Sequence, residues 1–425
     1  MRLFCLFLSG LLALAPGLAD ARRQPSPVPG PLHAGTRVER LVLLYRHGVR
    51  APLAGEAGMA PLASAAMPGW VTPESLLTPH GAAAIRLLAR YQGGLWRAAG
   101  LLPATGCPTA ADLAIWTNTP ARTIATGEAL AAGLAPGCAV AVGHLPAGRH
   151  DPVFEQREAG GDPFNAAQAA RDVNRSTGGA AAMARHYAPA LRRMAQVLGC
   201  DRARPPCRLA ALPGAIAPAA DGRSLAFSGP VEQASGTAQI FLLQYMEGFA
   251  PAEVGWGRAG PAVIAALSPL HAALFDVFDR SPYMAPRSAS VLARRMLSAL
   301  FDAGQPRLTL LVGHDNNIAA MGALLRTRFR VPGLGWNDPP PGGALGLALL
   351  RRADGRQMVR AFYVAARPGQ VRRLQALEGG HGPAEMALPI GLCGRQALAC
   401  PAPLLRRALA ARLLPLAPIA AGAQP

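Results

Sequence analysis

The feature that most constrains this chain is a buried-strand pattern that ends in a cluster of cationic side chains. Leu41-Val42-Leu43-Leu44 is a continuous apolar run, typical of a strand that is covered on both faces. It leads into Arg46-His47-Gly48-Val49-Arg50-Ala51-Pro52. A histidine between two arginines at the end of a buried strand is unfavourable unless an anion binds there. Phosphate fits, because guanidinium groups bind its oxygens in pairs and a neutral imidazole can attack its phosphorus.

A second apolar strand also ends in a histidine motif. The run Leu308–Val312 is followed directly by Gly313-His314-Asp315. In parallel sheets, ligands bind outside the carboxyl ends of the strands. The two motifs are therefore predicted to meet at one site, although they lie far apart in the sequence.

Strand and helix patterns alternate along much of the chain. Strands are predicted at 41–45, 112–116, 308–312, 345–350 and 358–365, with a turn at Asp354-Gly355 between the last two. Helices are predicted at 81–99, 123–134 and 287–301. Between 155 and 285 the strand signals fade, and helices are predicted at 180–198, 234–248 and 261–278. These patterns predict an α/β fold, with a mostly parallel sheet flanked by helices and an inserted, mainly helical cap domain.

The expected domain boundaries follow from these patterns. Residues 1–21 look like a secretory signal peptide, with a short basic start, an apolar run and a small-residue cleavage site at Ala19-Asp20-Ala21. A membrane anchor is the alternative, but the apolar run is short for a span and is interrupted by Gly and Pro. The other expected segments are a Pro-rich lead-in (22–37), an α/β domain that carries both histidine motifs (38–155 and 285–425) and the helical insertion (156–284).

The cysteines indicate an exported protein. Without Cys5, which the signal peptide would remove, six cysteines remain, and an even number suggests three disulfides in an oxidising compartment. A metal site is the alternative, but the chain has no CxxC motif and its spacings are too wide for zinc. We expect a periplasmic or secreted protein without a metal or cofactor. Proximity in the sequence favours the pairs Cys200–Cys207 and Cys393–Cys400, which leaves Cys107–Cys138.

The net charge of +18 is carried entirely by arginine, because the chain has no lysine. A strongly basic chain can bind nucleic acid. Here the arginines are scattered, and the aromatic residues that would stack on bases are few. We therefore expect no nucleic-acid partner, and no membrane partner once the signal is removed. The positive field would instead attract phosphorylated small molecules.

The motifs resemble those of the histidine acid phosphatases, in particular the bacterial periplasmic phytases and glucose-1-phosphatases. The family pattern RHGxRxP matches at Arg46, His47, Gly48, Arg50 and Pro52. The family's distant His-Asp pair matches at His314-Asp315, and a third family arginine matches Arg122. The similarity covers nearly all of the chain after the signal. It implies a phosphoglycerate-mutase-like fold.

The resemblance also implies a role for each matched residue. His47 is expected to be the nucleophile that forms a phosphohistidine. Asp315 is expected to protonate the leaving oxygen and then to help activate water, which requires an acidic working pH. The groups expected to hold the phosphoryl oxygens and to offset their charge are Arg46, Arg50, Arg122 and His314.

Three other functions are compatible with part of the pattern. A metal-dependent hydrolase could use His314-Asp315, but no further ligands stand out at suitable spacing. A cofactor-linked phosphoglycerate mutase also begins with Arg-His-Gly, but it is cytosolic. A non-catalytic protein could keep the pocket to bind phosphorylated ligands, although the intact His47 and Asp315 argue against it.

The substrate is the least constrained part of the prediction. The first motif is followed by Leu53-Ala54, as in glucose-1-phosphatases, where phytases commonly carry Thr and Lys. Other segments, including Gly255–Arg258 and Pro340–Gly343, look more like phytases. We therefore predict a phosphomonoesterase of sugar or inositol phosphates with broad tolerance.

Overall fold

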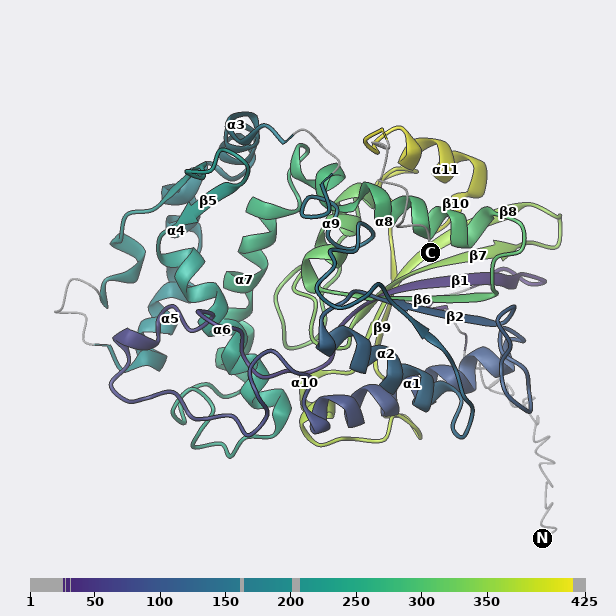
Figure 1. Ribbon diagram of the computed structural model, residues 1–425, viewed down its shortest axis with the longest axis horizontal. Coiled ribbons are helices and arrows are strands. Elements are labelled where there is room, and N and C mark those ends of the chain that lie inside the picture. The colour runs from purple at the N-terminus through teal and green to yellow at the C-terminus, as the bar shows by residue number, and fades with distance from the viewer. Residues whose placement is uncertain (1–25, 27, 31, 161–163, 201–206, 416–425) are drawn as a thin grey trace, which may run out of the picture.

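A central sheet with helices on both faces forms one end of the molecule, and a group of helices forms the other (Figure 1). The computed structural model describes residues 26, 28–30, 32–160, 164–200 and 207–415. The predicted signal peptide, Cys5 included, lies outside the described residues. The α/β class and the helical region beside the sheet agree with the sequence-based prediction.

Strands and α-helices alternate in the described residues near the two ends of the chain. The middle of the chain is mostly helical. The strands are β1 (Arg37–Arg46), β2 (Leu113–Thr117), β3 (Val142–Gly143), β4 (Ala215–Pro218), β5 (Leu225–Ser228), β6 (Leu308–Gly313), β7 (Ala344–Arg351), β8 (Gln357–Ala365), β9 (Ala384–Leu388) and β10 (Cys400–Pro401). The helices are α1 (Pro79–Ala98), α2 (Ala121–Leu134), α3 (Ala166–Thr177), α4 (Gly179–His186), α5 (Ala188–Leu198), α6 (Pro230–Glu247), α7 (Pro261–Phe278), α8 (Met284–Phe301), α9 (Asp315–Leu325), α10 (Pro368–Arg372) and α11 (Ala402–Ala410).

The main sheet has the strand order β10-β8-β7-β1-β6-β2-β3, and β9 also pairs with β8. Strand β1 lies near the centre, parallel to β6 and antiparallel to β7. The prediction of a mostly parallel sheet is wrong in this respect, because β7, β8, β9 and β10 pair antiparallel. The turn at Asp354-Gly355 explains part of the difference, since two strands joined by a tight turn can pair only antiparallel.

Helices cover both faces of this sheet. α1 and α2 lie on one face, and α8, α9 and α11 lie on the other (Figure 1). Between them, the β1 residues from Leu41 to Tyr45 are almost completely excluded from water. The continuous apolar run in the sequence therefore corresponds to a strand that is buried on both faces.

The region between the two parts of the sheet is mainly helical, as predicted. It contains α3 to α7 and a two-stranded hairpin, β4–β5. The predicted helix at 180–198 is two helices, α4 and α5, which meet at Tyr187. Pro189 explains the break, because it lacks an N–H and is tolerated only in the first turn of a helix. The sequence analysis did not predict α3 or the short hairpin.

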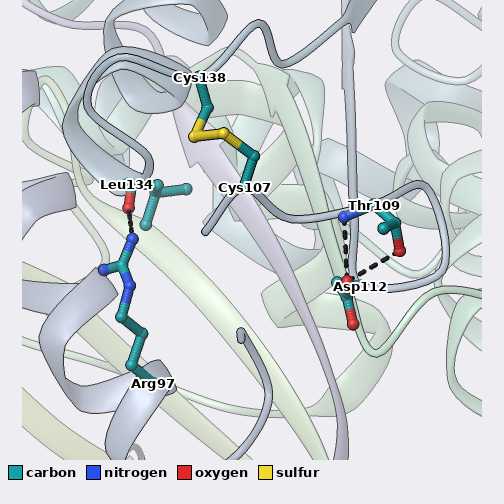
Figure 2. Close-up of a disulfide and its surroundings, with 6 residues drawn as sticks. All are labelled: Arg97, Cys107, Thr109, Asp112, Leu134 and Cys138. Atoms are coloured by element: carbon teal, nitrogen blue, oxygen red, sulfur yellow. Dashed lines mark hydrogen bonds between the residues drawn. A yellow bond between two sulfur atoms is a disulfide. The ribbon is translucent and has the colours of Figure 1, made fainter. Parts of the chain in front are cut away.

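Three disulfides are present among the described residues. Cys200–Cys207 and Cys393–Cys400 are the pairs that sequence proximity favours, and Cys107–Cys138 is the pair that they leave. Figure 2 shows Cys107–Cys138, which joins the loop before β2 to the chain just after α2. Nearby, Arg97 of α1 donates a hydrogen bond to the carbonyl of Leu134, the last residue of α2 (Figure 2). The disulfide thus fixes the end of α2 to the loop before β2, and the hydrogen bond from Arg97 fixes it to α1.

Gly81 allows α1 to pack directly on the backbone of the first histidine motif. A Cβ atom at Gly81 would lie 2.3 Å from the Val49 carbonyl oxygen and 2.9 Å from the Val49 nitrogen. We therefore expect Gly81→Ala to displace the segment after β1 and to lower the free energy of unfolding by about 1–3 kcal/mol. Gly94 is the matched control, because a Cβ there meets no atom within 4 Å.

Urea unfolding of both variants measures this effect. Gly94→Ala is expected to raise the free energy of unfolding by up to about 1 kcal/mol, because alanine has the higher helix propensity. If the two variants were equally stable, the close packing of α1 on Val49 would not be a real constraint.

Candidate active site

The parallel pairing of β1 and β6 brings the two histidine motifs together. Arg46 is in register with Gly313, and the backbone N–H of His47 donates to the carbonyl of Gly313 over 3.0 Å. The ring centroids of His47 and His314 are 5.5 Å apart. The two distant segments therefore meet at the carboxyl ends of adjacent strands, as predicted.

A third strand completes the edge of the site. β2 pairs with β6 and ends at Thr117, and the N–H of the next residue, Asn118, donates to the carbonyl of Val312. Helix α2 then begins at Ala121 and carries Arg122 in its first turn. Burial and the nearby charge of Arg50 lower the pKa of Arg122 to about 10. Arg122 thus belongs to the same charged cluster as the arginines of the first motif.

His47 is held in the form that an imidazole nucleophile needs. Its ring is 2% exposed, and Nδ1 lies 2.9 Å from the carbonyl oxygen of Gly48. Because a carbonyl can only accept, Nδ1 carries the proton and Nε2 keeps its lone pair. Burial and the charges of Arg46 and Arg122 hold the pKa of His47 well below its usual value. The ring therefore stays neutral in acid.

Each of the three arginines keeps at least one donor unused among the described residues. Arg46 donates to the carbonyl of Pro339 over 2.6 Å, and its Nη2 lies 2.8 Å from Oδ2 of Asp315. Arg50 binds Glu56 through both terminal nitrogens, at 2.7 and 2.8 Å. The buried Nε atoms of Arg46, Arg50 and Arg122 have no hydrogen-bond partner among the described residues. Since buried donors are normally paired, this cluster is suited to an anion.

His314 is the N-cap of α9 and is also neutral. Its Nε2 lies 2.9 Å from Nδ2 of Asn118, and the same amide nitrogen donates to Glu155 over 2.9 Å. Burial and the charge of Arg122 lower the pKa of His314 to about 3. Because the amide nitrogen of Asn118 can only donate, Nε2 of His314 accepts from it and Nδ1 carries the proton of the neutral ring. His314 can thus donate a hydrogen bond only through Nδ1, and it adds no charge.

Asp315 is an ionised carboxylate in this arrangement. Its side chain is 20% exposed, and Oδ2 lies 2.8 Å from Nη2 of Arg46 and 3.5 Å from Nε2 of His271. Burial alone would raise the pKa of Asp315, but the charges of Arg46 and His271 hold it well below its usual value. The carboxylate therefore needs a nearby negative charge before it can take up a proton.

Four residues in or beside the site were not predicted from the sequence. Glu56, Asn118 and His271 contact predicted site residues, and Asp338 contacts His271. None belongs to a short motif, and each reaches the site through the fold. One usable signal was present, because His271 interrupts an otherwise apolar helix pattern.

Known proteins with similar sequences and structures support the assignment of this cluster as an active site. The model of the histidine phosphatase superfamily (branch 2) matches residues 37–203. The phytase AppA of Escherichia coli K12 is 32% identical over 411 residues, covering 91% of this chain and 92% of that protein. The chain belongs to the histidine phosphatase superfamily.

Two further proteins are similar to this chain along most of their length. A glucose-1-phosphatase of Salmonella typhimurium is 27% identical, covering 81% of this chain and 84% of its own. The solved structure of Hafnia alvei phytase in complex with tartrate superposes with a TM-score of 0.84 at 30% identity, covering 90% of this chain and 99% of that one. The protein is a phosphomonoesterase of this superfamily.

Proposed function

We propose that the protein hydrolyses phosphate monoesters in two steps through a phosphohistidine at His47. The observation that carries the proposal is that the site combines an unprotonated histidine nitrogen with arginine hydrogen-bond donors that have no partner among the described residues. Nε2 of His47 has a lone pair and no proton, and three buried arginine Nε groups beside it lack partners among the described residues. A phosphoryl group would supply both an electrophile for His47 and an anion for the arginine cluster.

In the first step, Nε2 of His47 attacks phosphorus, and the bond from phosphorus to the ester oxygen breaks. Arg46, Arg50 and Arg122 bind the other phosphoryl oxygens and offset the charge of the transition state, and the neutral His314 contributes a hydrogen bond. The negative charge of the bound ester raises the pKa of Asp315, which takes up a proton and gives it to the leaving oxygen.

In the second step, Asp315 is again a carboxylate and accepts a proton from water as the water attacks the phosphohistidine. The products are inorganic phosphate and the neutral Nε2 of His47. Burial and the nearby arginines lower the pKa of His47, which favours the neutral ring that both steps need.

We propose sugar or inositol phosphates as the substrates, with broad tolerance for the alcohol. Glu56 neutralises one of the three arginines, and Leu53 and Ala54 add no cation to the loop that leads to it. Strong selection for a highly charged ester is therefore not expected. Phytase and glucose-1-phosphatase names both occur among the relatives.

We further propose that the enzyme acts in the periplasm or outside the cell. The predicted signal at residues 1–21 and the three disulfides support this location. The proposed domains are those predicted from the sequence, with the cap at 156–284 inserted between the two parts of the α/β domain.

Phosphate release at pH about 4–5 tests the function. One preparation should be assayed with p-nitrophenyl phosphate, glucose 1-phosphate and phytate. Comparable rates on all three are expected for the broad specificity proposed here, and a strong preference for phytate would contradict that specificity. If the folded protein bound phosphate but released none from any ester, it would be a phosphorylated-ligand binding protein instead.

A further inference from the structure

A buried histidine, His271, contacts the carboxylate of Asp315 and has no role in the proposed reaction. His271, on α7, is 7% exposed, and its Nε2 is 3.5 Å from Oδ2 of Asp315. Its Nδ1 is 2.7 Å from Oδ1 of Asp338. A ring placed between two carboxylates is most stable with a proton on each nitrogen. Although burial opposes the charge, Asp338 and Asp315 raise the pKa of His271 to about 9.

Asp338, the second carboxylate that contacts the His271 ring, is held in place by its own hydrogen bonds. Asp338 is 1% exposed, and its Oδ2 accepts a hydrogen bond from the hydroxyl of Ser268. Ser268 lies on α7 one turn before His271, and its oxygen accepts from the N–H of Gly335 over 2.8 Å. The imidazolium is thus held at a fixed place by its own helix and by the loop before β7.

We propose that His271, paired with Asp338, is a positioning residue that supplies a fixed positive charge to Asp315 and thereby confines general-acid catalysis to acid pH. The inference rests on the proposed role of Asp315 as the proton donor to the leaving oxygen. His271 itself need not contact the substrate.

Asp315 has charged or titratable neighbours on each element packed against it. From the strands these are Arg46, His47 and Tyr363, from α2 Arg122, from the start of α9 His314, and from α7 and the loops around it His271, Asp279 and Asp338. Among the cations, the arginines have unused donors for phosphate. Both nitrogens of His271 face carboxylates, so its effect on Asp315 can be separated from substrate binding.

His271→Asn tests the proposal. Asparagine can still donate to Asp338, but it removes the positive charge. Without that charge the pKa of Asp315 rises, so Asp315 stays protonated to higher pH. With glycerol 2-phosphate, whose alkoxide leaving group needs a proton, kcat is therefore expected to fall at a higher pH than in the wild type. This basic limb of the pH profile is expected to move by about 1 pH unit. With p-nitrophenyl phosphate, whose leaving group needs none, the limb is expected to move much less.

Two further variants separate charge from structure. Asp338→Asn removes the anion that keeps His271 protonated, so the limb is expected to move in the same direction. Ser268→Ala disturbs the same cluster without changing a charge, so its basic limb is expected to stay at the wild-type pH even if kcat falls. A lower kcat with an unmoved limb in both His271→Asn and Asp338→Asn would overturn the proposal, because it would indicate a purely structural role.

A measurement on the wild-type protein covers the case in which the variants do not fold. In a titration of ¹⁵N-labelled histidine side chains by NMR, one ring is expected to remain an imidazolium above pH 8. If every ring were neutral by pH 8, the proposal would fail. An inactive wild type would instead contradict the proposed function, and the titration would still report on His271.

Discussion

His47→Ala is expected to lower kcat with p-nitrophenyl phosphate at least about 10⁴-fold, because it removes the nucleophile and Nε2 of the neighbouring His314 already accepts from Asn118. The arginines and His314 remain in this variant, so the phosphate site persists. Inorganic phosphate is therefore expected still to raise the melting temperature of the variant. Turnover is measured as nitrophenol release, and phosphate binding as the shift in thermal unfolding.

An exposed histidine supplies the matched control for this variant. His144 is exposed, and its ring forms a hydrogen bond with the backbone carbonyl of the next residue, Leu145. His144→Ala is expected to retain full activity. If His47→Ala retained more than a small percentage of wild-type kcat, the nucleophile would have to be sought elsewhere.

Asp315→Asn is expected to separate esters by the quality of their leaving group. The amide cannot supply a proton, so kcat with glycerol 2-phosphate should fall about 10²–10⁴-fold. The first step with p-nitrophenyl phosphate should fall much less, because nitrophenolate leaves without a proton. Rapid-quench measurement of nitrophenol release reports that step directly.

The control for Asp315→Asn is Asp354→Asn. Asp354 lies in the exposed turn between β7 and β8, where its oxygen accepts from the N–H of Arg356 and an amide oxygen can do the same. This variant is expected to behave as wild type on both esters. An equal loss of the first-step rate on both esters in Asp315→Asn would show that Asp315 holds the site together and does not act as an acid.

The sequence predicted those parts of the site that lie next to a strand end. The first motif begins at Arg46, the last residue of β1, and the second begins at Gly313, the last residue of β6. A strand can be recognised from its apolar run, and the carboxyl ends of parallel strands share one edge of the sheet. That rule alone is sufficient to place His47 and His314 in one site.

Residues that reach the site by tertiary packing could not be predicted in this way. His271 and Asp338 lie on a helix and a loop that meet only in the folded chain. The mixed sheet was missed for a related reason, because the apolar pattern of a buried strand does not reveal its direction. The break between α4 and α5 was missed although Pro189 marks it.

The most direct test of the account is to trap the covalent intermediate. The enzyme is mixed with a ³²P-labelled ester and quenched in alkali, in which phosphohistidine survives, whereas acid hydrolyses it. The account predicts a labelled, acid-labile peptide that contains His47 and is absent from His47→Ala. Steady turnover with no labelled protein at any quench time, or a label on another residue, would contradict it.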